Sequence, residues 1–271
     1  MNRTGDGALL VLGATGAVGQ ALLGRLTAAD APVIAWSRPR DGDLFAASLP
    51  PSAGVLSAGP IDGLVSALRR SPACVPATLV ALSSSSAHFK QGSASAAERS
   101  MAAALLASER SLATLCESRG TRCVILRPTL IYGGEDRAHF RAVAAQARRV
   151  GMLVLPRSAR GLRMPIHAED LAASMLGALD RSHAAGSFDV GGGETLPYDV
   201  MLQRVLRARH VPPRTLRVPD ALFRLLLGCA HRAGLLLGLT RAMVLRMRDD
   251  LLVDDTPARA EFGHAPGPFR P

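Results

Sequence analysis

The sequence predicts an α/β fold in which helices cover a doubly wound parallel sheet, followed by a small and mostly helical cap. Short apolar runs bounded by turn residues alternate with helical stretches, as buried parallel strands alternate with their crossover helices. A glycine triplet stands between the first apolar run and the first helical stretch. After Gly186 the alternation gives way to mostly helical sequence. We therefore predict a main domain over residues 1–186 and a cap over residues 187–271.

The length and composition fit this architecture. The chain has 271 residues, of which 48% are hydrophobic and 20% charged, so it can bury a large core and is not expected to be disordered. The formal net charge is +10, almost all of it from arginines scattered singly or in pairs. A nucleic-acid surface needs a clustered basic face, so no nucleic-acid partner is expected. Scattered arginines suit small anionic molecules better.

The cysteines and the N-terminus indicate a cytoplasmic protein. The four cysteines form no Cys-x-x-Cys pair and no metal-ligand spacing with the seven histidines, so we expect reduced, buried thiols and no metal. The apolar run at residues 8–12 is too short for a signal peptide. The sequence leaves the oligomeric state open between monomer and homodimer.

The first half of the chain gives the opening of the sheet. Expected strands lie at residues 8–12, 32–36, 54–58 and 77–82, and expected helices at 18–28, 61–70 and 94–119. The long stretch at 94–119 is rich in alanine and leucine and contains no proline or glycine, which favours a helix. Gly120 follows it at the position where a glycine commonly ends a helix.

The second half continues the pattern and then forms the cap. Expected strands lie at residues 123–126, 152–155 and 188–190, and expected helices at 137–149, 168–180, 198–209 and 220–239. The last of these is apolar but carries Arg224, His231 and Arg232, which disfavours a membrane span. We expect a helical lid there, with peripheral membrane contact as the alternative.

The glycine triplet predicts a dinucleotide site. Gly13, Gly16 and Gly19 follow an apolar strand and open a helix, the context that a Rossmann phosphate-binding turn requires. Glycines let the chain turn sharply, bring the backbone close to a pyrophosphate and allow the helix to pack on the sheet. The helix N-terminus supplies N–H groups and a positive dipole end. The expected cofactor contacts are Gly13, Ala14, Thr15, Gly16, Ala17, Val18 and Gly19.

The end of the second strand indicates which dinucleotide binds. NAD-specific sites usually carry an acidic residue there for the ribose 2′-hydroxyl. This chain carries Ser37 and Arg38 directly after the strand, and these side chains can hold a 2′-phosphate. We therefore expect NADP(H) rather than NAD(H), unless Arg38 is a solvated loop residue.

Several motifs in the same order resemble the short-chain dehydrogenase/reductase superfamily, in particular its extended and atypical NAD-dependent epimerase/dehydratase branch. They are the glycine turn and the segments at 56–60, 82–89, 126–133, 163–171 and 189–195. The resemblance implies further cofactor contacts at Ser57, Ala58, Gly59, Ser83, Arg127 and Pro128. It also implies a substrate site that contains Tyr132, Arg163 and His167.

The chain departs from this family at its proton-transferring pair. The family carries Tyr-x-x-x-Lys on the long helix, where this sequence has Met101 and Leu105. The only tyrosines are Tyr132 and Tyr198, and neither has a lysine four residues later. The only lysine, Lys90, is expected in a solvated loop. The tyrosine–lysine mechanism is therefore excluded by composition.

Two functional interpretations lead, beside a third in which the substrate pocket carries out redox-neutral chemistry. The first is an atypical NADP(H)-dependent oxidoreductase or epimerase that acts on a small, anionic or nucleotide-linked substrate. Its proton would come from Ser84, Ser85, His88 or water, with Tyr132 as a hydrogen-bond donor in the pocket. Of these groups, only His88 has an ordinary pKa near neutrality. The second is a catalytically silent NADP(H)-binding regulatory or scaffold protein, since the pocket residues could also serve purely structural roles.

Overall fold

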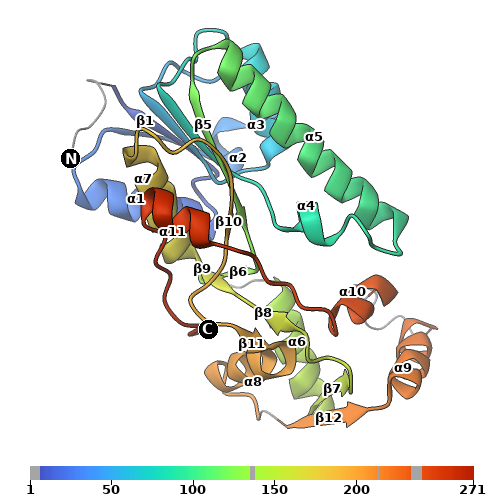
Figure 1. Ribbon diagram of the computed structural model, residues 1–271. Helices are drawn as coiled ribbons and strands as arrows, with labels where there is room; N and C mark the ends of the chain where they lie inside the picture. The colour runs from blue at the N-terminus through green and yellow to red at the C-terminus, as the bar shows by residue number, and fades with distance from the viewer. Residues whose placement is uncertain (1–6, 135–137, 213, 233–239) are drawn as a thin grey trace.

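The computed structural model describes residues 7–134, 138–212, 214–232 and 240–271. Its centre is a six-stranded sheet in which all neighbouring strands run parallel (Figure 1). The strands are β1 (Leu9–Leu12), β2 (Val33–Trp36), β3 (Gly54–Ser57), β4 (Thr78–Leu82), β5 (Arg122–Pro128) and β10 (Gly186–Val190).

The spatial order of these strands is β10-β5-β4-β3-β1-β2. The order reverses between β1 and β3, which makes the sheet doubly wound and confirms the predicted fold class. In such sheets, ligands bind outside the carboxyl ends of the strands, at the crevice where the order reverses. The glycine turn follows β1 and therefore lies at this crevice.

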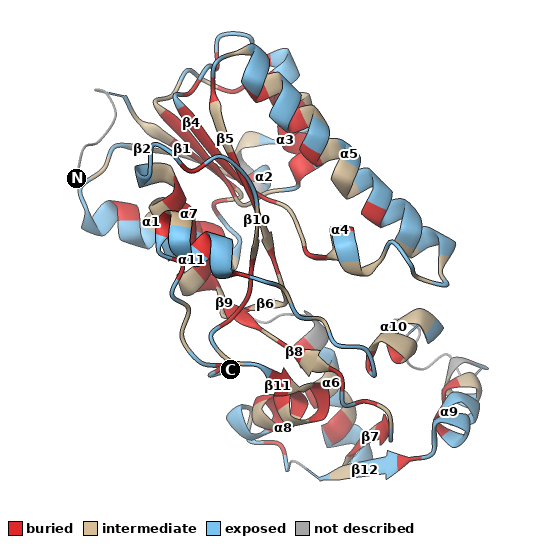
Figure 2. Cartoon of the chain, viewed as in Figure 1, coloured by how far each residue is buried: buried red, intermediate tan, exposed pale blue. Residues whose placement is uncertain are grey.

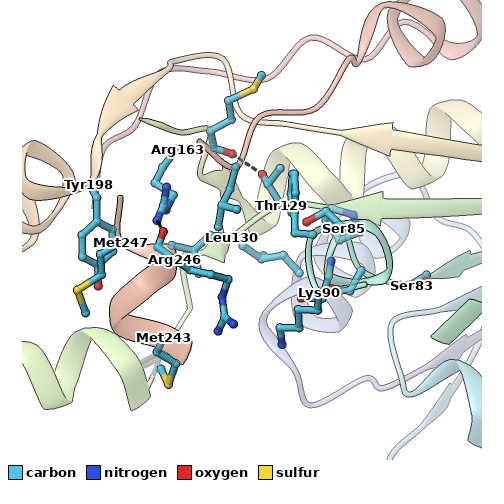
Figure 3. A pocket seen from close by; sticks show the side chains of 17 residues that line it. Ser83, Ser85, Lys90, Thr129, Leu130, Arg163, Tyr198, Met243, Arg246 and Met247 are labelled. Carbon is cyan, nitrogen blue, oxygen red and sulfur yellow. Dashed lines mark hydrogen bonds between the residues drawn. The ribbon is translucent and has the colours of Figure 1, made fainter. Parts of the chain in front are cut away.

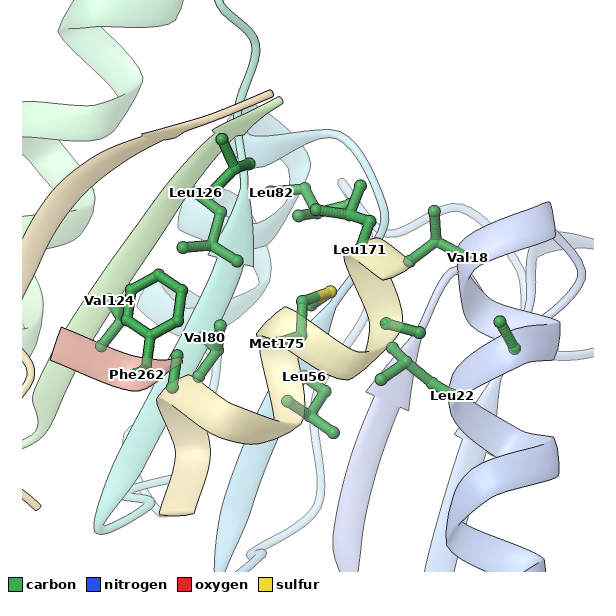
Figure 4. Packing of buried hydrophobic residues seen from close by; sticks show 14 of the residues in the cluster. Val18, Leu22, Leu56, Val80, Leu82, Val124, Leu126, Leu171, Met175 and Phe262 are labelled. Atoms are coloured by element: carbon green, nitrogen blue, oxygen red, sulfur yellow. The ribbon is translucent and has the colours of Figure 1, made fainter. Parts of the chain in front are cut away.

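Helices cover both faces of the sheet. On one face lie α1 (Ala17–Ala28), α7 (Ala168–Asp180) and α11 (Thr256–Phe262), and on the other lie α3 (Ile61–Arg70) and α5 (Ala96–Ser118). Figure 4 shows the first of these cores, in which the fully buried Leu22, Leu171 and Met175 pack on the sheet. The central strands β1, β3 and β4 are buried on both faces, which explains their continuous apolar runs.

A second core lies beyond the carboxyl ends of the sheet (Figures 1 and 2). It contains α6 (Ala138–Val150), β7 (Leu153–Pro156), α8 (Tyr198–Ala208), β12 (Thr215–Val218), α9 (Asp220–Arg232) and α10 (Arg241–Arg246). Elements α6 and β7 of the second core precede β10, the last strand of the sheet, and α11 near the C-terminus packs in the first core. Each core is therefore built from segments that are not contiguous in the sequence. The boundary at residue 186 stays a prediction.

Short elements join the two parts. β6 (Ile131–Tyr132) pairs in parallel with β9 (Ile166–His167), and β8 (Leu162–Arg163) pairs antiparallel with β11 (Leu196–Pro197). Two one-turn helices, α2 (Arg38–Asp41) and α4 (Ser86–Phe89), follow β2 and β4. These short elements carry no periodicity that a sequence pattern can detect, but α4, β6 and β8 each contribute residues to the cavity described below.

The predicted helix ends agree closely with the structure. Helix α5 ends at Ser118, and Gly120 takes the left-handed conformation with φ of 66°. The prediction of a helix over 220–239 is met by α9 as far as Arg232, and residues 233–239 lie outside the described part of the chain. No helix among the described residues is long and apolar enough to cross a bilayer.

The cysteines differ from expectation at one position. All four are free thiols, and Cys74 and Cys116 are buried as predicted, while Cys123 is half-buried. Cys229 is exposed, which corrects the prediction that it is buried. The reason is that α9 turns only one side to the second core, where Phe223 and Leu227 pack, and Cys229 lies outside that side.

Candidate functional site

The turn after β1 has the geometry of a phosphate cradle. Gly13 has a φ of 78°, and a Cβ placed there would lie 2.9 Å from the carbonyl carbon of Ala58. A Cβ on Gly19 would overlap the carbonyl oxygen of Gly13. Helix α1 begins after Gly16 and has no acidic residue in its first turn, so its N-terminus keeps its positive potential. Both the sterics and the electrostatics suit a bound pyrophosphate.

The neighbouring strand end completes this cradle. Ser57 lies beside Leu12 in the sheet, and Ala58 and Gly59 follow it against the glycine turn. The Ser57 hydroxyl is fully buried and has no hydrogen-bond partner in the described part of the chain. A buried polar atom without a partner is uncommon and is often found beside a binding site. The residues that the sequence assigns to a dinucleotide therefore fit such a group.

At the end of β2 the structure adds an acidic residue. Ser37 is buried and precedes α2, while Arg38 is exposed as the first residue of that helix. The Asp41 carboxylate accepts a hydrogen bond from the Ser37 backbone N–H at 2.7 Å. Sequence reasoning missed Asp41, because it stands after Pro39 rather than at the strand end. A cation and a carboxylate thus both lie near the expected ribose position.

At the ends of β4 and β5, Ser83 and Arg127 both bind the buried carboxylate of Glu109. Ser83 Oγ donates to Glu109 Oε1 at 2.5 Å, and Arg127 Nε donates to Glu109 Oε2 at 3.0 Å. Glu109 is 4% exposed, and its hydrogen bond to Arg127 raises the pKa of that guanidinium. Sequence reasoning missed Glu109, which joins α5 to two strands and holds both predicted cofactor residues in place.

A cavity at the carboxyl ends of β4 and β5 faces the second core (Figure 3). Its volume is about 400 Å³. The sheet side contributes Ser83, Ser84, Ser85, Ser86, Phe89, Lys90, Pro128, Thr129, Leu130 and Ile131, and the other side contributes Arg163, Met164, Tyr198, Met243, Arg246, Met247 and Leu251. The predicted residues Ser83, Ser84, Ser85, Pro128 and Arg163 are therefore brought together here.

Lys90 lines this cavity, although the sequence placed it in a solvated loop. It is half-buried, and its Nζ donates to the sulfur of Met101 at 3.2 Å. Burial lowers the pKa of Lys90, the nearby Arg246 lowers it further, and Glu98 opposes them. Arg246 is ion-paired with Glu98, which lies one helical turn before Met101 on α5. Lys90 thus contacts α5 through Met101 at the edge of the cavity.

Arg163 lines the same cavity, but its hydrogen bonds run into the protein. It is 6% exposed and donates to the carbonyl oxygens of Leu162, Asp249 and Arg246 at 2.8, 2.7 and 2.6 Å. Its guanidinium also lies over the Tyr198 ring, 5.0 Å from the centroid. Arg163 therefore links the C-terminal end of α10 to β8. Its hydrogen bonds point away from the cavity, but its positive charge still lies at the cavity wall.

Tyr132 and His167 surround a different, smaller cavity of about 270 Å³. The Tyr132 hydroxyl donates to the Pro268 carbonyl at 3.3 Å and accepts from the Arg270 N–H at 3.0 Å. His167 Nδ1 accepts from the Glu169 N–H at 3.2 Å and so caps α7. The two rings meet edge to face, with centroids 5.0 Å apart.

The structure thus separates the predicted catalytic residues into two groups. Ser84 and Ser85 line the larger cavity, whereas Tyr132 lines the smaller one. His88 is exposed on α4 and lines neither cavity. Burial raises the pKa of Asp189, and the nearby His88 acts in the opposite direction. In the described ranges, no group of three or more His, Cys, Asp or Glu side chains is placed to hold a metal ion.

The protein has a doubly wound α/β fold. Its glycine turn forms a cradle suited to a pyrophosphate at the crevice where the strand order reverses. Residues 63–191 match the model of the NAD dependent epimerase/dehydratase family, which confirms the resemblance that the motifs predicted. No curated protein sequence matches the chain.

Solved structures of similar shape extend the comparison. The epimerase Mth375 from Methanothermobacter thermautotrophicus has a TM-score of 0.72 and 16% identity, covering 98% of this chain and 90% of that chain. RMD from Pseudomonas aeruginosa, complexed with NADPH, has a TM-score of 0.68 and 16% identity, covering 96% and 94%. MoeE5, in complex with UDP-glucose and NAD, has a TM-score of 0.68 and 16% identity, covering 97% and 94%. At this identity the likeness establishes the shared fold.

Proposed function

We propose that the protein is a nicotinamide-dinucleotide-dependent oxidoreductase or epimerase-like enzyme that acts on a small molecule in the 400 Å³ cavity. The observation that carries the proposal is the position of this cavity. It adjoins the carboxyl ends of β4 and β5, where ligands of doubly wound sheets bind, and it is lined by hydroxyl, cationic and apolar side chains. A protein that only held a cofactor would not require such a cavity.

The cofactor belongs along the sheet crevice, with its pyrophosphate at the N-terminus of α1 and its adenosine end toward Ser37 and Arg38. NADP(H) remains our preferred form, because Arg38 is exposed and can meet a 2′-phosphate. The Asp41 carboxylate favours NAD(H), but its hydrogen bond to the Ser37 N–H turns it toward the backbone. Structures of similar fold hold either cofactor, NADPH in RMD and NAD in MoeE5.

When bound, the nicotinamide supplies a hydride acceptor or donor. The chain must then orient the reacting oxygen of the substrate and handle its proton. Ser84 Oγ accepts a hydrogen bond from the Ser86 N–H at 3.2 Å, which leaves its own proton free to donate to that oxygen. A serine hydroxyl holds its proton tightly, so Ser84 would pass on a proton taken from water in the open cavity. Ser85 is buried and supports this turn through its N–H bond to the Pro128 carbonyl.

The experiment measures binding and turnover separately. NADPH and NADH are titrated into the protein with reduced-nicotinamide fluorescence as readout, and carbonyl and nucleotide-sugar substrates are then screened by absorbance. We expect NADPH to bind more tightly than NADH and at least one substrate to oxidise it. Ser84→Ala should lower kcat by about a hundredfold to a thousandfold, the range for lost proton or oxyanion donors, with cofactor affinity unchanged.

Ser118→Ala is the matched control, because Ser118 is exposed at the far end of α5 and bonds only to the Leu115 carbonyl. It should leave both binding and turnover intact. Tight cofactor binding with neither cofactor oxidation nor an epimerised product from any substrate would instead support the second interpretation, a silent cofactor-binding regulatory or scaffold protein. Absence of binding to either dinucleotide would refute both interpretations.

A further inference from the structure

We propose that the large cavity selects a monocarboxylate with an apolar body, and that Lys90 anchors its carboxylate. The inference rests on the proposed function, because it names the substrate class of that same cavity. It follows from three properties of the described lining: one cation with few partners, a predominantly apolar opposite wall and a small volume.

Of the cations that line the cavity, Lys90 has the weakest hydrogen-bond partner among the described residues and can therefore bind a ligand. Its ammonium group carries three N–H donors, and among the described residues the one hydrogen bond found for it goes to the sulfur of Met101, a weak acceptor. The other two cations at the cavity are committed. Arg246 pairs with Glu98, and Arg163 donates to backbone carbonyls. An anion that reaches Lys90 would therefore supply acceptors that the protein does not.

The local charge also favours an anion. Lys90, Arg246 and Arg163 bring three positive charges to the cavity wall, and Glu98 offsets one of them. In Figure 3 the charged ends of Lys90 and Arg246 extend toward the same opening from opposite sides of the cavity. Because Lys90 is half-buried, a carboxylate beside it is shielded less by water than at an exposed site.

The remaining walls suit a hydrocarbon body better than a sugar. Leu130 and Ile131 line the sheet side, and Met164, Met243, Met247 and Leu251 line the other. Two polar groups at the cavity are already used, because Thr129 Oγ1 donates to the Met164 carbonyl and Ser83 Oγ donates to Glu109. The hydroxyls of a sugar that faced these apolar side chains would lose water without gaining partners, which is costly. Methionine side chains adapt readily to an irregular apolar ligand.

The volume limits the size of the substrate. Ligand pockets commonly span about 300–1,000 Å³, and this cavity of about 400 Å³ lies near the lower end. It must also admit the reactive end of a cofactor, so little room remains for a nucleotide.

The test is equilibrium binding by calorimetry to the full chain, with octanoate, its neutral analogue octanamide and UDP-glucose as probes. We expect octanoate to bind at least tenfold more tightly than octanamide. Lys90→Met should weaken octanoate about tenfold and leave octanamide unchanged, whereas Lys90→Arg should keep most of the affinity. Arg110→Met is the matched control, since it removes one positive charge from an exposed position on α5, away from the cavity lining.

Equal binding of octanoate and octanamide would overturn the inference, as would equal effects of Lys90→Met and Arg110→Met. Displacement of octanoate by UDP-glucose would also overturn it in favour of a nucleotide-linked substrate. Fluorescence titration of NADPH in the same samples keeps the two proposals apart. Carboxylate binding without cofactor binding contradicts the proposed function alone, and cofactor binding without carboxylate binding contradicts this inference alone.

Discussion

At the scale of single residues, Gly19 gives the sharpest test of the cradle. A Cβ at this position would overlap the Gly13 carbonyl oxygen, so α1 could no longer pack against the turn. We expect Gly19→Ala to weaken NADPH binding at least tenfold, measured by nicotinamide fluorescence. Gly24→Ala is the control, because it lies in the same helix with nothing within 4 Å of the new Cβ. It should preserve binding and add about 0.5–1 kcal/mol of stability, since alanine favours helix. Equal binding by both variants would contradict the cradle.

Single residues also show what sequence reasoning reaches. Gly13 and Gly19 were predictable because a backbone conformation and a close approach demand glycine there, and both demands are local. Glu109 and Lys90 were not, because their roles depend on contacts between elements far apart in the chain. Nothing in an alanine-rich helix marks Glu109 as the partner of Arg127. Tyr132 was assigned to the pocket, but its hydroxyl is engaged by residues 268 and 270 at the end of the chain.

At the scale of elements, His264 joins three of them. Its ring lies 2.7 Å from Ser174 Oγ on α7 and 2.9 Å from the Gly191 carbonyl after β10, and it follows α11 directly. Burial lowers the pKa of His264 below its ordinary value of 6.5, although Gly191, Asp255 and Asp170 act in the opposite direction and Arg259 adds to the lowering. The unfolded chain therefore takes up this proton at a higher pH than the folded protein does.

The sign of the pH dependence follows from this difference. The contribution of His264 to stability is complete above its unfolded pKa and is lost as the pH falls below it. Urea unfolding should show the free energy of unfolding falling between pH 7 and 5.5, by at most about 1.4 kcal/mol per pH unit from this one group. His264→Gln should flatten that slope, and His210→Asn, a change at an exposed histidine, should not. An unchanged slope in His264→Gln would rule out the assignment.

Long elements were predictable and short ones were not. The helix over 168–180 and the strands of the sheet contain enough apolar residues for each element to be recognised from its sequence pattern. The two-residue strands β6, β8, β9 and β11 have no period, because partners elsewhere in the chain create them. Because contacts between distant segments place β8 and α10 at the cavity, the sequence pattern alone could not predict the cavity lining, whereas the strand, turn and helix around the glycines could be predicted locally.

At the scale of the whole molecule, charge and α9 together test the alternative of peripheral membrane contact. Helix α9 packs Phe223 and Leu227 into the second core and leaves Leu222, Leu225 and Leu226 exposed on an outer face. The net charge of +10 would draw this face toward anionic lipids, and Arg224 and Arg232 on the same helix are exposed. A helix with an apolar face and basic neighbours can lie in a bilayer interface.

We expect the protein to co-sediment with vesicles that contain phosphatidylserine and to be released by high salt. Leu225→Glu together with Leu226→Glu should reduce the bound fraction at least tenfold, because a buried leucine side chain contributes about 1.5–3 kcal/mol. The folded state should be unaffected, since both side chains are exposed. Leu216→Glu on β12 is the control for charge alone, because this leucine is also exposed but lies outside α9. If the wild-type protein stays in the supernatant at low salt, α9 serves only to pack Phe223 and Leu227 into the second core.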